Sequence, residues 1–403
     1  MIRTVFSACR FAFGVPFRGD PPNGILIYPK YSAGEPDTRE LLNRLPEYLD
    51  EGAPIYLCAE ESGSEEGTSL DASAPGNIEV VRPGSSDFRE ALHESRLVLL
   101  KGRTQAHMYR FLDPSSERQY VRLYHGLITK GYGRHARDHR AASRRRRFVQ
   151  WLEDRYLNAG IDVHTVASEV ERFFRASAEG RDPTYFETLG YPRFDRIREL
   201  LQAHGEPAIP QPLCGTLDDA STTLLYAPTH KDSAYETELF PFGDFDVDRL
   251  HSLLEAMDAT LLLRMHPSEE DSGAYDALVD GERIRYAGQS VTESPIELLP
   301  AVDVLITDYS SIYVDFLPFD RPIVFIPDRH DRFQSIRGLA FNYDRYFPGE
   351  HVQTFEEFTE HVETLADGEA DGHAANRQFV RQVLLPDWER GSIEVLLNRF
   401  EFD

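Results

Sequence analysis

The stretch 298–327 constrains the fold of this chain more than any other. An apolar run, Val304–Thr307, leads into a polar turn that contains Asp308 and two serines. A short helical pattern ends near Pro318, and a second apolar run, Ile323–Ile326, follows it. Short apolar runs bounded by turn signals are typical of strands in a parallel sheet that is covered on both faces. The stretch therefore predicts a strand, a turn, a helix and a strand of an α/β protein.

The two serines of this turn, Ser310 and Ser311, stand where the strand gives way to the helix. Serine is a common helix N-cap, so a capping role is one interpretation. The other is ligand binding, because the first N–H groups of a helix and the positive end of its dipole favour an anion. The turn predicts an anion site.

Other apolar runs also end in polar residues. Residues 120–124 run into His125, residues 223–226 into the segment that holds Thr229 and His230, and residues 260–265 into His266. In open α/β sheets ligands bind outside the carboxyl ends of the strands. The repeated placement predicts a ligand site at these ends. Further strands are expected at 24–28, 55–58, 78–81, 96–100 and 163–167, and helices at 38–49, 108–112, 169–174 and from 355 onward.

A chain of 403 residues favours two domains of about 200 residues each. Residues 204–219 combine proline, glycine and acidic residues without periodicity, which is typical of a linker. We therefore expect an N-terminal domain at 1–205 and a C-terminal domain at 206–403, whose final helices pack back across the boundary.

The charge and cysteine content limit partners and location. The formal net charge is −25 and only four of the 43 basic residues are lysines. Such an acidic surface argues against nucleic acid as a partner and suits a salt-rich cytoplasm. The three cysteines are far apart, which fits a reducing compartment and neither a disulfide nor a zinc site. No signal-peptide pattern and no apolar run long enough to cross a bilayer occur, so we expect a cytoplasmic protein.

One basic stretch, 134–155, interrupts this acidic background and includes the arginines Arg144–Arg147. It is either a solvated helix face, balanced by Asp138, Glu153 and Asp154, or a patch that meets an anionic partner. That partner would be a phosphate-rich acceptor or an anionic membrane surface, which predicts peripheral attachment to the inner face of the cell membrane.

Taken together, several short motifs resemble the CDP-glycerol glycerophosphotransferase family, which includes the teichoic-acid polymerases and primases. The matching residues are Tyr124–His125–Gly126 with Lys130 and Gly133, Gly190–Tyr191–Pro192–Arg193 with Asp195, Tyr226–Ala227–Pro228–Thr229, His266–Pro267, Thr307–Asp308–Tyr309–Ser310–Ser311 with Asp315, and Arg337–Gly338. They follow the family order over about 60% of the chain. The sequence departs from the family pattern at Leu127–Ile128–Thr129, where Thr-Pro is usual, and at Lys231, where an aromatic–Arg pair is usual.

The resemblance implies a GT-B fold, with two Rossmann-like domains whose parallel sheets face an inter-domain cleft. It implies an enzyme that moves glycerol phosphate, or a related polyol phosphate, from CDP-glycerol or another CDP-alcohol to a hydroxyl of a lipid-linked or polymeric acceptor. CMP is released, and no cofactor or metal is expected.

The resemblance also assigns residue roles. His125 looks like the general base that takes the acceptor proton, the alternative being a capping histidine. His266 looks like the contact that stabilises charge on the leaving diphosphate, the alternative being a core histidine. The implied substrate-binding residues are Gly126, Lys130, Arg193, Thr229, Asp308, Ser310, Ser311, Asp315 and Arg337. Among these, Asp308 either shapes its turn or holds the ribose.

Two other functions remain open from the sequence. A GT-B glycosyltransferase that uses a nucleotide-sugar would present a similar phosphate site. A non-catalytic nucleotide-binding regulator would bind a donor without turnover and tolerate loss of His125.

Overall fold

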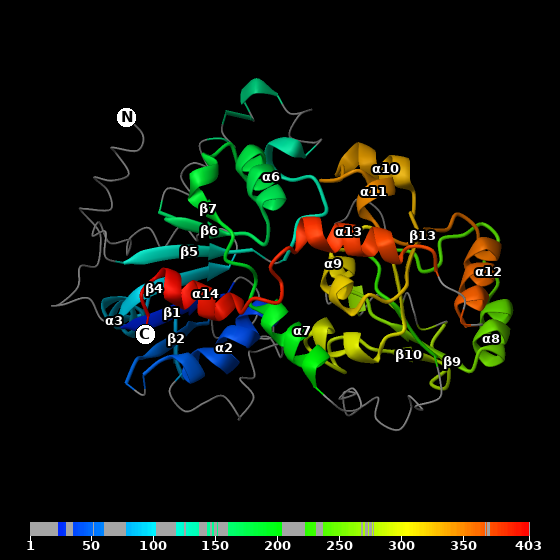
Figure 1. Cartoon of the computed structure of the whole chain (residues 1–403), viewed down its shortest axis with the longest axis horizontal. Coiled ribbons are helices and arrows are strands. Elements are labelled where there is room, and N and C mark those ends of the chain that lie inside the picture. The colour runs from blue at the N-terminus through cyan, green and yellow to red at the C-terminus, as the bar shows by residue number, and fades with distance from the viewer. Residues whose placement is uncertain are drawn as a thin grey trace. The chain divides into compact units, whose positions relative to one another are not determined.

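The structure is a computed structural model of the chain (Figure 1). It describes residues 23–29, 35–50, 52–59, 78–101, 118–124, 126–136, 143–145, 147–148, 151, 160–203, 222–230, 237–266, 269–270, 273, 276, 278–366, 368 and 371–402. The chain divides into two compact units. Unit 1 comprises Met1–Leu127, Ala141–Arg196 and Asp387–Asp403, and unit 2 comprises Ile128–Arg140 and Ile197–Pro386.

This division differs from one cut at 205 and 206. The last segment, 387–403, belongs to unit 1, and the segment 128–140 belongs to unit 2. The expected linker at 204–219 lies outside the described residues, so its placement stays a prediction.

Unit 1 is built on a seven-stranded sheet in the order β3-β2-β1-β4-β5-β6-β7, and every neighbouring pair is parallel. The strands are β1 (Gly24–Tyr28), β2 (Ile55–Cys58), β3 (Ile78–Val81), β4 (Ser95–Lys101), β5 (Gln119–Leu123), β6 (Val163–Thr165) and β7 (Phe186–Glu187). Chain order reverses between β1 and β4, which is the switch point of dinucleotide-binding folds.

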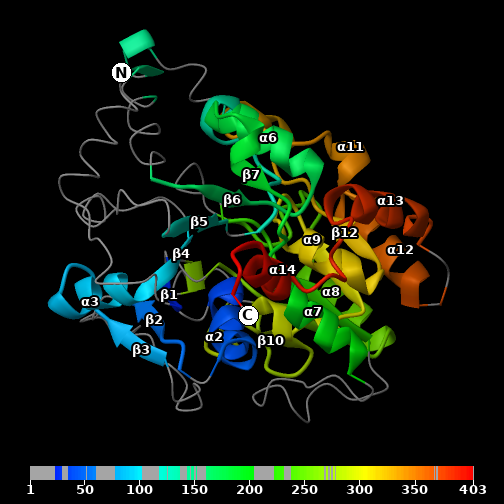
Figure 2. The same ribbon diagram turned by 60° about the vertical axis from the view of Figure 1, so that its left-hand side comes forward.

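Alternate residues of β1 supply the cores on the two faces of this sheet. Ile25 and Ile27 join the core formed with helices α2 (Pro36–Tyr48) and α14 (Ser392–Arg399). Leu26 and Tyr28 join the core formed with α3 (Ser86–Glu94) on the other face (Figure 2). A strand buried on both faces reads as an unbroken apolar run, which is why it was predictable.

Unit 2 repeats the same strand order. Its six strands are arranged β10-β9-β8-β11-β12-β13, again all parallel, with the switch point between β8 and β11. They are β8 (Thr222–Tyr226), β9 (Ala259–Leu263), β10 (Ile284–Tyr286), β11 (Val304–Thr307), β12 (Ile323–Phe325) and β13 (Glu350–His351). Helices α8 (Val247–Ala256) and α12 (Phe355–Ala366) share one core with β8, β9 and β11.

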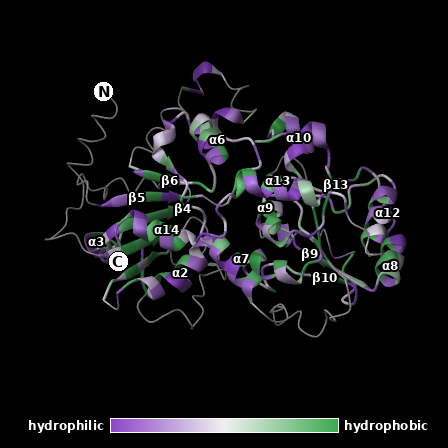
Figure 3. Cartoon of the chain, viewed as in Figure 1, coloured by the Kyte–Doolittle hydropathy of each residue, from purple (hydrophilic) through white to green (hydrophobic). Residues whose placement is uncertain are grey.

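The described residues form six further α-helices. They are α6 (Glu169–Glu179), α7 (Arg193–Gln202), α9 (Ile312–Phe316), α10 (His330–Ile336), α11 (Tyr343–Tyr346) and α13 (Ala374–Leu384). Hydrophobic residues gather on the strands, as the colouring of Figure 3 shows. No helix in the described part of the chain is long and apolar enough to cross a membrane.

The predicted strands and their parallel arrangement are confirmed, with ends shifted by two residues at most. The predicted helix at 108–112 lies outside the described residues. Three marginal strands, β7, β10 and β13, were not predicted. Each has only two or three residues and is partly exposed, so none gives a sustained apolar run.

Candidate functional site

The switch point of unit 2 joins two of the predicted residues. Thr229 follows β8 and Asp308 follows β11, and the backbone N–H of Thr229 donates to Oδ1 of Asp308 at 2.8 Å. The N–H of Tyr309 donates to the same oxygen at 2.6 Å. Asp308 is only 1% exposed, so its buried carboxylate fixes the loops that follow β8 and β11. The turn-shaping role expected for Asp308 is therefore present in the structure.

The hydroxyl of Thr229 lies beside this junction. Its residue is 2% exposed, and in the described part of the chain Oγ1 has no hydrogen-bond partner. A buried hydroxyl is costly to leave unpaired, so its presence at a switch point favours a ligand contact.

The turn after β11 is held by aromatic packing. The ring of Tyr309 stacks on Phe333 with centroids 4.0 Å apart, and its carbonyl accepts a bond from Oγ1 of Thr129 at 3.1 Å. The next residues, Ser310 and Ser311, are partly exposed. This packing leaves the two serines at the surface of a rigid turn.

Ser311 occupies the N-cap position of α9 but its side chain makes no capping bond. Helix α9 has only five residues, so its dipole is small and the expected anion site depends on hydroxyls and local N–H groups instead. Asp315 lies within α9 and is buried.

A pair of histidines stands at the carboxyl ends of β8 and β9. The rings of His230 and His266 stack with centroids 4.7 Å apart. Nδ1 of His230 lies 3.2 Å from Oε2 of Glu269, whose other oxygen accepts a bond from Thr237 at 2.7 Å. Partial burial lowers the pKa of His266, and the neighbouring charges of His230 and Lys130 lower it further. His266 is therefore neutral at pH 7 in the free protein and offers an N–H donor.

Lys130 belongs with this cluster, although its place in the chain had assigned it to the first domain. The segment 129–131 pairs with residues 338–340: Lys130 bridges Leu339, and the N–H of Gly131 donates to Gly338 at 2.9 Å. These backbone bonds hold Lys130 in unit 2, next to the predicted Arg337. The placement of Lys130 in an N-terminal domain at 1–205 is wrong, because its pairing partners belong to unit 2.

Of the predicted residues of unit 1 that the structure describes, Gly126 follows β5 and Arg193 begins α7. His125 lies outside the described residues. Gly126 has φ +115°, and a Cβ there would come within 2.9 Å of Nη1 of Arg193, so a side chain does not fit. Arg193 itself is 5% exposed.

The guanidinium of Arg193 is engaged by acidic residues of the same unit. It donates to Oδ1 and Oδ2 of Asp37 at 3.1 and 2.8 Å and to Glu35 at 3.3 Å. Lys101 lies 2.6 Å from the same Asp37. Burial alone would raise the pKa of Asp37, but the charges of Arg193 and Lys101 outweigh burial and hold it well below its usual range. This network orders the start of α2 and α7, and substrate binding by Arg193 stays a prediction.

The structure thus brings Thr229, His266, Lys130 and the turn 308–311 together in unit 2. Sequence reasoning gave no role to His230, Glu269 or Thr129. The polar run after β8 was the available signal for His230, whereas the contacts of Glu269 and Thr129 are purely tertiary. In the described part of the chain no cluster of residues suited to a metal occurs.

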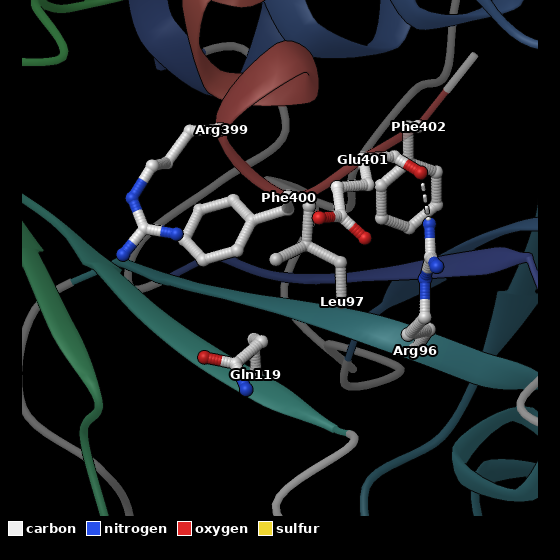
Figure 4. A pocket seen from close by; sticks show the side chains of 7 residues that line it. All are labelled: Arg96, Leu97, Gln119, Arg399, Phe400, Glu401 and Phe402. Atoms are coloured by element: carbon white, nitrogen blue, oxygen red, sulfur yellow. Dashed lines mark hydrogen bonds between the residues drawn. The ribbon is translucent and has the colours of Figure 1, made fainter.

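Unit 1 contains a hollow of about 330 Å³ (Figure 4). It is formed at the start of β4 and β5 by Leu97, Gln119 and the C-terminal residues around Phe400, with Arg96 donating to the carbonyl of Glu401. Ligands of such sheets bind at the opposite, carboxyl edge, so this hollow is not the candidate site.

Two Rossmann-like units, with polar residues gathered at the switch point of the second, define an α/β protein of the GT-B class. The family model described as CDP-Glycerol:Poly(glycerophosphate) glycerophosphotransferase matches residues 31–390, and the chain belongs to this family.

Two of the curated relatives are longer proteins than this chain. The chain is 27% identical to the teichoic acid ribitol-phosphate polymerase TarL of Staphylococcus aureus over 193 residues, 47% of this chain and 33% of that protein. It is 32% identical to the teichoic acid poly(glycerol phosphate) polymerase of Bacillus subtilis over 149 residues, 36% of this chain and 19% of that protein. The chain therefore matches about a third or less of the length of these two relatives.

Solved structures show the same fold. The wall teichoic acid polymerase TagF aligns with a TM-score of 0.73 at 18% identity, covering 99% of this chain and 93% of that chain. A UDP-N-acetylglucosamine 2-epimerase from Listeria monocytogenes aligns with a TM-score of 0.55 at 13% identity, covering 95% of this chain and 97% of that chain. The predicted GT-B fold class, with two parallel-sheet α/β domains, is confirmed.

Proposed function

We propose that this chain transfers glycerol phosphate, or a related polyol phosphate, from a CDP-alcohol to a hydroxyl of a lipid-linked or polymeric cell-envelope acceptor. CDP-glycerol is the donor we favour. Family membership and the activities named for the relatives support the proposal.

The observation that carries the proposal is the cluster at the carboxyl edge of unit 2. Thr229 and Asp308 meet at the switch point, Lys130 lies close enough to His266 to lower its pKa, and two serines occupy the turn after β11. Hydroxyls, an imidazole N–H and a lysine ammonium together suit a nucleoside diphosphate. Arg337 and Asp315 complete the proposed donor site.

In the proposed reaction the acceptor hydroxyl attacks the β-phosphorus of the donor. A new P–O bond forms to the acceptor, the bond from the β-phosphorus to the bridging oxygen breaks, and CMP leaves with the electron pair. His125 takes the acceptor proton. His266 and Lys130 stabilise the charge that develops on CMP, so the step needs no cofactor in this proposal.

A nucleotide-sugar donor is the second candidate. The likeness to a UDP-N-acetylglucosamine 2-epimerase concerns the fold alone, and it makes a uridine nucleotide worth testing. The two candidates differ in the product, because only the first releases CMP.

We also propose peripheral attachment to an anionic membrane. The side chains of Arg144, Arg145 and Arg147 are exposed, and the neighbouring Phe148 is 58% exposed and stacks on Trp151 at 5.8 Å. Exposed arginines beside aromatic rings suit an anionic lipid surface. Vesicles containing phosphatidylserine should retain the protein, and a triple substitution of these arginines to glutamine should release it. Equal retention of both proteins would refute attachment through this patch.

The main test identifies the nucleotide that is released from CDP-glycerol, CDP-ribitol and UDP-sugars when a lipid-linked acceptor is present. The assay is run in high salt because salt screens the repulsion within a protein whose net charge is −25. Release of CMP that His125→Ala and His266→Ala abolish would support the proposal. Release of UDP instead would support the second candidate, and calorimetric binding of a donor without turnover would support a regulator.

A further inference from the structure

Two buried cations hold the chain on both sides of residue 125. The ammonium of Lys101 donates to the carbonyl of Tyr124 at 2.7 Å. Nη2 of Arg175 donates to the carbonyl of Gly126 at 2.9 Å. Lys101 is 2% exposed and Arg175 is 4% exposed, so water does not compete for either bond.

Each cation is held by its own carboxylate. Lys101 lies 2.8 Å from Glu35 and 2.6 Å from Asp37, both at the start of α2. Arg175, on α6, donates from Nε to Oε1 of Glu171 at 2.7 Å. Buried charges that are paired in this way are rigid, because any movement would leave a charge unpaired.

Further contacts fix the orientation of Arg175 and of the residue before 125. The guanidinium of Arg175 lies 3.6 Å from the ring centroid of Tyr124, and its Nη2 is 3.3 Å from the hydroxyl of Tyr191. The hydroxyl of Tyr124 lies 2.7 Å from Nδ1 of His164 and donates to Glu179 at 2.7 Å. The ring, the carbonyl and the hydroxyl of Tyr124 are thus all engaged.

We propose that Lys101 and Arg175 are positioning residues that fix the backbone around His125 for proton transfer. This inference rests on the proposed function of His125 as the general base. The reaction slows when the position of a catalytic group varies by about an ångström. A loop that carries a general base therefore needs such support. Neither cation touches substrate in this proposal. Each acts through the carbonyl next to residue 125.

The test compares Arg175→Met and Lys101→Met with a matched control, Arg118→Met. Arg118 is also buried, at 1% exposure, and also donates to backbone carbonyls: those of Leu92 in α3 and of Ser95 at the start of β4. Its loss should reduce stability by a similar mechanism without affecting residue 125. Arg175→Lys is made as well, because it keeps a cation beside Glu171 in case the methionine variant fails to fold.

Two readouts are needed. Amide hydrogen exchange of a peptide spanning 124–128 should become at least tenfold faster in Arg175→Met and Lys101→Met, and should change less than twofold in Arg118→Met. In turnover, kcat should fall at least tenfold with KM for CDP-glycerol within twofold, and Arg175→Lys should recover part of the loss. Unchanged exchange, or an equal loss of kcat in Arg118→Met, would overturn the inference.

Different results would refute the proposed function and the positioning role. Wild-type protein that releases no CMP, or full activity of His125→Ala, would refute the proposed function. The exchange measurement does not depend on turnover and still decides whether the two cations hold this segment.

Discussion

The backbone N–H of Thr229 and the carboxylate of Asp308 lie 2.8 Å apart and join the loops that follow β8 and β11. These two strands flank the switch point of unit 2. Because Asp308 accepts a second bond from Tyr309, one buried carboxylate fixes the start of both loops.

Replacing Asp308 should lower the free energy of unfolding. Asp308→Ala leaves two buried N–H groups without their acceptor, at a cost of about 1–3 kcal/mol each. Asp308→Asn keeps an oxygen in place and should cost less than half as much. Urea unfolding measures both free energies. Equal losses in the two variants would mean that the charge, and not the two hydrogen bonds, is what the site requires.

His266 should take up a proton when the donor binds. Partial burial, helped by His230 and Lys130, holds its pKa below the usual 6.5, so the free protein carries it neutral at pH 7. A bound diphosphate favours the cation and raises this pKa. Calorimetry of CDP-glycerol binding near pH 6, in buffers of different ionisation enthalpy, should detect uptake of part of a proton. The uptake should disappear in His266→Gln, and its persistence there would assign it to another group.

The sequence predicted the strands of both sheets because each is buried on two faces and reads as an apolar run. It also predicted where the polar residues cluster, since the carboxyl ends of parallel strands share one edge. It did not predict which residues these polar side chains contact. The contact of Thr129 with Tyr309 joins residues 180 positions apart, and Glu269 near His230 is one of many acidic residues. Lys130 was misplaced for the same reason, because only the pairing with 338–340 shows its unit.

The ion network around Asp37 should dominate the acid sensitivity of unit 1. Removing the carboxylate in Asp37→Ala leaves Lys101 and Arg193 with one fewer anion in a buried site, at a cost of about 3–5 kcal/mol. The folded-state pKa of Asp37 is lowered from 3.8. Its contribution is therefore fully present above pH 4 and is lost as the pH falls below that value.

Urea unfolding of the wild type and Asp37→Asn at several pH values checks this sign. The stability gap between them should be constant from pH 5 to 7 and should narrow below pH 4. A gap that widens on acidification would show that the carboxylate is not the paired group.

Gly131 should tolerate no side chain. A Cβ there would lie 2.8 Å from the carbonyl oxygen of Arg337, and backbone cannot move aside as a flexible side chain can. Gly131→Ala should therefore separate 129–131 from 338–340 and lower donor affinity at least tenfold. Gly243→Ala is the matched control in the same unit, because nothing lies within 4 Å of its Cβ position. Equal affinity of the two variants for CDP-glycerol would show that this pairing is not needed for binding.

The position of Lys130 predicts that its loss weakens binding of the donor and not binding of the acceptor. Held in unit 2 by the bridge to Leu339, its ammonium lies close enough to His266 to lower the pKa of that imidazole. It should therefore contact the donor diphosphate, and loss of one charged contact costs about 1.5–3 kcal/mol. Lys130→Gln should weaken CDP-glycerol binding by roughly tenfold to a hundredfold at this cost, whereas KM for the acceptor should stay within about twofold. Calorimetry and initial rates measure the two effects. A raised acceptor KM with unchanged donor affinity would instead place Lys130 on the acceptor side.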